Sequence, residues 1–193
     1  MLCSKGDADY ILELRLTPIQ QPEEETMQQQ TNPTYISWLQ DALVMEQTLV
    51  GVLEQRIEAS GDFPDVQQMD RVHLAETKEH VTRVEQCLQR LGSGPSTSKS
   101  MMSSLMAAME KPAKALMKDE VIKNCLQDYG AECFEVACYT SLIAAATALG
   151  DRETVTACQQ NLQQDQAMAE RILAGIPSVT VVELERSAVE ATT

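Results

Sequence analysis

Residues 121–149 read VIKNCLQDYGAECFEVACYTSLIAAATAL, a stretch in which apolar side chains recur at every third or fourth position. One face of this stretch carries Ile122, Cys125, Tyr129, Glu132, Val136 and Tyr139. That spacing is typical of an α-helix with one buried face, whereas a strand would alternate. Gly150-Asp151 follows the last apolar residue, so the pattern predicts a long helix over about residues 119–149.

Three other stretches show the same spacing between residues that stop helices. They predict helices over residues 33–59, 65–91 and 152–174. The first begins after Asn32 with a proline in its first turn, and the last stops before Gly175-Ile176-Pro177. Short turns join the helices of each pair, and a longer link separates the two pairs. The sequence therefore predicts an all-α protein, an antiparallel four-helix bundle.

The segments outside the four helices differ in composition. Residues 1–32 are mostly polar, and we expect them to be a disordered extension of a bundle that occupies residues 33–176. Residues 101–117 are rich in Met and Ala and predict a short extra helix, interrupted by Pro112, in the central crossover. Residues 177–193 are expected to form a tail or a further short helix.

Charge and composition argue against several classes of partner and location. The chain has 15 Lys and Arg against 29 Asp and Glu, a formal net charge of −14. Such a surface repels phosphate groups, so neither nucleic acid nor a membrane is an expected partner. No run approaches the about 18 apolar residues of a membrane span, and acidic residues near the N-terminus argue against a signal peptide. The six cysteines form no CxxC pair, which favours reduced thiols in a cytoplasmic protein.

Charged or polar residues interrupt the apolar face of every predicted helix. They are Glu46 in the first helix, His73, Glu76 and His80 in the second, Glu132 with Glu135 at its edge in the third, and Asp165 in the fourth. A buried carboxylate without a partner costs several kcal/mol or becomes protonated. Carboxylates that converge from four helices repel one another unless cations lie between them.

A pair of divalent metal ions would neutralise such a cluster, and imidazole would add a neutral nitrogen ligand. Carboxylate and imidazole ligands suit iron or manganese. We therefore predict a dimetal site at the centre of the bundle, formed by Glu46, Glu76, His80, Glu132, Glu135 and Asp165.

Each of these residues also has an ordinary structural interpretation. A single Glu on an apolar face is more often at the boundary of the core or paired with Lys or Arg than bound to metal. His80 alone would be a solvated histidine, and Glu135 and Asp128 would lie on a solvated face. Glu79, next to His80, is expected at the surface.

Three stretches resemble a known family. They are DALVMEQTLVGVL at 41–53, HLAETKEHVTRVEQCLQRLG at 73–92 and AECFEVACYTSLIAAATALGD at 131–151. The chain is similar, over about residues 35–173, to the YciE/YciF family of bacterial ferritin-like proteins. The resemblance implies a ferritin-like fold, a homodimer, and an association with stress responses without an assigned reaction.

The resemblance also bears on the metal ligands. Family positions suspected of binding metal fall on Glu46, Glu76, Glu132 and Glu135, and on His80, where other members often have Gln. The fourth helix departs from the family pattern, because residues 163–169 read QQDQAMA where members tend to have Glu-Glu-Glu-Lys-Ala-x-Asp. The site would then hold two ions, one ion, or none.

Two functions follow from these observations. The first is a stress-associated ferritin-like protein that binds divalent metal ions in a partly degraded dimetal site. The alternative is a dimeric helical bundle without catalysis, which acts as an interaction or structural protein. His80 favours the first, and the neutral residues of the fourth helix favour the second.

Overall fold

The computed structural model describes residues 32–95 and 120–190. Four helices make up the described part: α1 (Pro33–Ala59), α2 (Pro64–Arg90), α4 (Glu120–Ala148) and α5 (Arg152–Glu190). The predicted all-α bundle is therefore confirmed. The predicted N-terminal extension and the short helix at 101–117 lie outside the described residues.

Local sequence explains where the helices begin and end. The side chain of Asn32 accepts hydrogen bonds from the backbone N–H groups of Thr34 and Tyr35, which caps α1. Gly150 lies between α4 and α5 with a φ of 71°, a conformation that glycine adopts without strain. Asp151 then accepts a hydrogen bond from the backbone N–H of Thr154 and caps α5.

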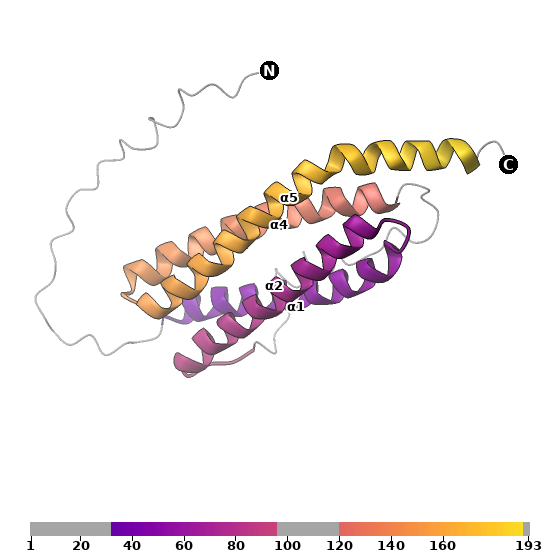
Figure 1. Ribbon diagram of the computed structural model, residues 1–193. Helices are drawn as coiled ribbons and strands as arrows, with labels where there is room; N and C mark the ends of the chain where they lie inside the picture. Colours follow the sequence, from indigo (N-terminus) through magenta and orange to yellow (C-terminus); the bar gives the residue numbers. More distant parts are fainter. Residues whose placement is uncertain (1–31, 96–119, 191–193) are drawn as a thin grey trace, which may run out of the picture. The chain divides into compact units, whose positions relative to one another are not determined.

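The helices pack as two antiparallel hairpins, α1 with α2 and α4 with α5 (Figure 1). Across the bundle, α1 also contacts α4, and α2 contacts α5, so each helix packs mainly against two others. The largest apolar cluster includes Leu39, Leu43, Leu88, Leu142 and Ala146. Packing of this kind provides most of the stability of helices in water.

The fourth helix is longer than the sequence predicts. It continues through Pro177 to Glu190 instead of ending before Gly175, so the predicted boundary between 176 and 177 is wrong. Pro177 removes one backbone hydrogen bond, but Val179 belongs to a buried apolar cluster with Phe63 and Val66, which anchors the continuation. Figure 1 shows the yellow C-terminal part of α5 at an angle to its orange part.

The described helices do not include a membrane span. None of them combines the length and the apolar composition that crossing a bilayer requires.

The cap of α1 gives a first testable prediction. Asn32→Ala removes the side-chain acceptor of two backbone N–H groups, so the free energy of unfolding should fall by about 0.5–2 kcal/mol in urea titrations. Thr34→Ala, a change at an exposed neighbour, should alter it by less than about 0.5 kcal/mol. Equal losses in the two variants would contradict the assignment of the cap.

Candidate metal centre

A cluster of polar side chains lies inside the bundle, and all four helices contribute to it. Its buried titratable members are Glu46 from α1, His73 and His80 from α2, Glu132 and Glu135 from α4, and Asp165 from α5. Glu46 and Glu132 have no exposed surface. These side chains form two neighbouring groups, each with one histidine and two carboxylates.

The first group consists of His73, Glu132 and Glu135. One potential ligand atom from each of the three lies within 4.8 Å of the others, so the group can hold a metal ion. The Nε2 atom of His73 is 2.5 Å from Oε1 of Glu132. Burial lowers the pKa of His73 to about 4, and burial together with the charge of Glu46 raises that of Glu132 to about 8. Near pH 7 and without a cation, this contact therefore joins two neutral groups.

The second group consists of Glu46, His80 and Asp165. The Nδ1 atom of His80 is 3.4 Å from both Oε1 of Glu46 and Oδ1 of Asp165. These distances exceed those of normal hydrogen bonds, and Nδ1 has no hydrogen-bond partner. Burial lowers the pKa of His80, but the nearby carboxylates of Glu46 and Asp165 outweigh it, and the net pKa is raised.

Gln164 determines which ring nitrogen of neutral His80 carries the proton. Its Oε1 atom accepts a hydrogen bond from Arg83 at 2.7 Å and lies 3.2 Å from Nε2 of His80. Because Arg83 can only donate, this atom of Gln164 is the acceptor, and Nε2 of His80 must carry a proton. In neutral His80 the lone pair of Nδ1 therefore faces the carboxylates of Glu46 and Asp165, as a metal ligand would.

Many polar atoms of the cluster lack hydrogen bonds. Seven buried side-chain atoms of the described residues have no partner, and six of them belong to the cluster. The six are Oε2 of Glu46, Nδ1 of His80, both carboxylate oxygens of Glu132, Oε2 of Glu135 and Oδ2 of Asp165. Buried polar groups are normally satisfied, so these atoms fit the donor set of a cation site.

Burial also favours the protonated forms of Asp165 and Glu135. The pKa of Asp165 is raised to about 8 by burial and by the charges of Glu46 and Glu132. Burial and the same neighbouring charges raise that of Glu135 well above its usual value. A metal ion would displace these protons, so binding would depend on pH.

The structure places the predicted ligand Glu76 at the edge of the cluster and adds His73 as a candidate ligand. Glu76 is partly exposed, and its carboxylate lies 3.1 Å from Nη2 of Arg171, so it is paired at the edge of the cluster. His73, one turn earlier on α2, occupies the interior position instead. The sequence carried a signal for this, because position 73 shares one helix face with 77, 80 and 84, which are also buried. Asp128 is also buried, against Arg56, instead of solvated.

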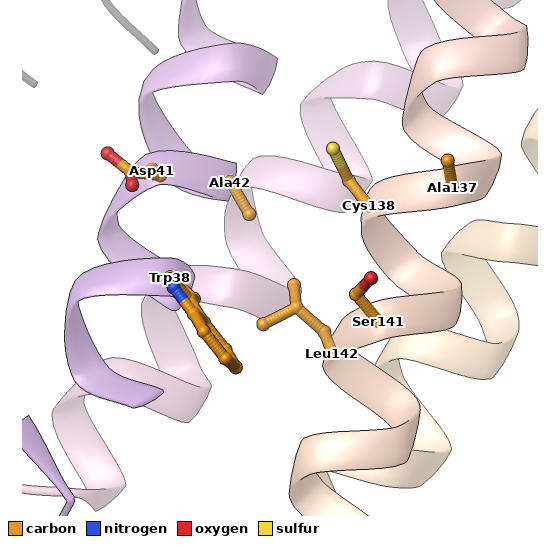
Figure 2. Close-up of a pocket in the computed structure, with 7 residues that line it drawn as sticks. All are labelled: Trp38, Asp41, Ala42, Ala137, Cys138, Ser141 and Leu142. Atoms are coloured by element: carbon orange, nitrogen blue, oxygen red, sulfur yellow. The ribbon is translucent and has the colours of Figure 1, made fainter. Parts of the chain in front are cut away.

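A surface pocket lies beside the cluster between α1 and α4. It has a volume of about 320 Å³, and Figure 2 shows Trp38 and Leu142 facing each other across it. Cys138 lines the same pocket, and its pKa is raised to about 11 by burial and by the charge of Glu46. Among the described residues that line it, Asp41 is the only carboxylate, so these residues do not offer a metal donor set.

Comparison with known proteins identifies relatives. Residues 19–185 match the model of a family described as a domain of unknown function, DUF892. A Xanthomonas campestris protein of known structure is 28% identical, with a TM-score of 0.68 over 80% of this chain and 96% of that chain. YcfI from Rhodopseudomonas palustris is 25% identical, with a TM-score of 0.61 over 72% of this chain and 90% of that one.

A third solved structure is described as the E. coli stress protein YciF. It is 18% identical, with a TM-score of 0.65 over 76% of this chain and 94% of that chain, and at this identity it shows the fold alone.

Proposed function

This chain belongs to the DUF892 family, as its resemblance to YciE/YciF proteins predicted. From that premise we propose that it is a metal-binding ferritin-like protein of the bacterial stress response. Two ions of iron or manganese bind between the four helices. His73, Glu132 and Glu135 hold one ion, and Glu46, His80 and Asp165 hold the other. The stress role follows the description of YciF, which shares the fold.

One observation carries the proposal. Six buried oxygen and nitrogen atoms that could bind metal, and that lack hydrogen bonds, belong to residues that lie together in the core. Leaving a buried polar atom unpaired costs about 1–3 kcal/mol. A cation would satisfy several of these atoms at once, and it would replace the protons that the raised pKa values of Glu132 and Asp165 retain.

The residues would do three things for a bound ion. Carboxylate oxygens and imidazole nitrogens match the ligand preferences of iron and manganese. Gln164 keeps the Nδ1 lone pair of His80 directed at the site, and apolar neighbours such as Met168 exclude water. When bound, such an ion would supply Lewis acidity and redox chemistry toward oxygen or peroxide.

The second candidate function is that of an interaction or structural protein, which has the same helical bundle but binds no metal. Gln163 and Gln164 favour it, because the family tends to have acidic residues there. In that case the melting temperature would not respond to metal, and Glu46→Leu would stabilise the fold by about 1–3 kcal/mol, since it removes a buried carboxylate. The homodimer and the cytoplasmic location stay predictions in either case.

Metal content distinguishes the two functions. The full chain is loaded anaerobically with excess Fe²⁺ or Mn²⁺, desalted and analysed for metal. We expect one to two ions per chain, about the capacity of the two groups, with a higher melting temperature than in chelator. Less than about 0.2 ion per chain, with no thermal shift, would overturn the metal proposal.

A further inference from the structure

A directed series of hydrogen bonds crosses the bundle and ends on Glu46. Arg83 of α2 donates to Oδ1 of Asn161 at 2.8 Å. Nδ2 of Asn161, on α5, donates to the hydroxyl of Tyr139 at 2.7 Å. That hydroxyl, on α4, donates to Oε1 of Glu46 at 2.5 Å. Each of the four helices therefore contributes one member of the series.

The chemistry of the first member sets the direction of the whole series. Arginine has only donors, so the atom of Asn161 that faces it must be the oxygen. The amide nitrogen of Asn161 then points at Tyr139, whose oxygen has to accept. Tyr139 has a single hydroxyl proton, and among the described residues the acceptor left for it is Oε1 of Glu46.

The series ends at an incomplete carboxylate. Oε1 of Glu46 accepts the hydrogen bond from the tyrosine hydroxyl, whereas Oε2 is buried without a hydrogen-bond partner. The ring of Tyr139 also packs edge-on against the imidazole of His80, with centroids 6.1 Å apart. One fully buried side chain thus contacts two of the residues in the second group.

A second buried tyrosine in the same bundle shows what a purely structural pair looks like. Tyr35 donates to Oδ2 of Asp151 at 3.1 Å. There, Arg90 and Thr154 supply further hydrogen bonds, and both oxygens of Asp151 have partners. The pair of Tyr139 and Glu46 differs in that one oxygen of its carboxylate is left free.

We propose that Tyr139, held by Asn161 and Arg83, is a positioning residue that fixes Glu46 so that Oε2 is presented to the metal ion. This inference rests on the proposed function. Residues that orient ligands without touching the metal typically change metal affinity by about 10–100-fold. Tyr139 would act through its hydroxyl proton, because its ring contributes equally to packing when the hydroxyl is absent.

The test is Mn²⁺ titration calorimetry of the full chain at fixed pH. Tyr139→Phe should raise the dissociation constant about tenfold or more. Tyr35→Phe is the matched control, because it also removes a buried hydroxyl that donates to a carboxylate; its dissociation constant should stay within about twofold of the native value. The melting temperatures of both metal-free variants show that they fold.

A second variant tests the direction of the series. Asn161→Asp places an acceptor opposite Tyr139, so the hydroxyl should turn away from Glu46 toward the new carboxylate. We expect weaker Mn²⁺ binding, as in Tyr139→Phe, although the variant gains a negative charge. A merely electrostatic or structural role would give equal or tighter binding.

The outcomes separate this inference from the proposed function. Native-like Mn²⁺ affinity in Tyr139→Phe, or unchanged or tighter binding in Asn161→Asp, would overturn the positioning role while the metal site stands. Absence of Mn²⁺ and Fe²⁺ binding by the native chain would overturn the metal site itself, and the positioning role with it.

Discussion

Glu132→Gln should abolish the binding of iron and manganese and leave the bundle folded. Glu132 has no exposed surface, its Oε2 atom has no polar partner, and its Oε1 atom has only the 2.5 Å contact with Nε2 of His73 among the described residues. Glutamine has nearly the same shape but carries no negative charge, so the affinity should fall at least about 100-fold. Calorimetric titration with Mn²⁺ measures the loss.

The control for this variant is Glu58→Gln, at an exposed position of α1. It removes the same charge from the chain, and its affinity should remain within about twofold of the native value. The metal-free Glu132→Gln protein should melt at the native temperature or above it, because a buried carboxyl group has been replaced by a neutral one. Native-like metal binding by Glu132→Gln would show that Glu132 is not a metal ligand.

The metal-free protein should become less stable as the pH rises from about 5 to 8. Glu132 and Asp165 have folded pKa values of about 8, against 4.5 and 3.8 as model values. Between these limits the folded chain holds protons that the unfolded chain has released, so raising the pH favours unfolding. Glu135, whose pKa is also raised, acts in the same direction.

His73 opposes this trend over part of the range. Its pKa is lowered to about 4 from 6.5, so between these values the unfolded chain binds the extra proton and stability rises with pH. The carboxyl groups outnumber it, and their effect extends to higher pH. The net loss of unfolding free energy between pH 5 and 8 should be on the order of 5 kcal/mol.

Urea titrations in chelator and in saturating Mn²⁺ measure this dependence. Metal competes with the same protons, so its stabilising effect should grow with pH. The two curves should therefore diverge between pH 6 and 8, with the metal-bound protein the more stable (about 3 kcal/mol or more at the upper end). Rising stability in chelator over this range would contradict the protonated cluster.

The sequence predicted most of the fold because helix periodicity and stop signals are local. The ends of α1 and α2 were predicted within a residue or so, since Pro33, Ser60-Gly61 and Gly92 act on the adjacent backbone. The length of α5 was not predictable in this way. Burial of Val179 in an apolar cluster with Phe63 and Val66 outweighs the local effect of Pro177, and only the tertiary structure shows this cluster.

The interior of the candidate site was predicted less completely. Glu46, His80, Glu132 and Asp165 lie in the core where periodicity placed them. Periodicity could not separate Glu76 from His73, because the two flank the same face and the choice depends on the rotation of α2. Arg171, on a helix far along the chain, pairs with Glu76 and favours that rotation.

Gln164 shows why a missing carboxylate does not by itself remove a site. From the sequence, the neutral residues of the fourth helix weakened one half of the predicted centre. In the structure, Gln164 accepts from Arg83 and orients His80 instead of ligating. Asp165, the acidic residue that remains, faces His80 from the other side.

Anomalous diffraction from crystals of the Mn²⁺-loaded full chain tests the account most directly. We expect two peaks inside the bundle, one among His73, Glu132 and Glu135 and the other among Glu46, His80 and Asp165, with ligand distances of about 2.0–2.3 Å. A bundle interior without manganese peaks, in crystals grown at saturating Mn²⁺, would contradict it.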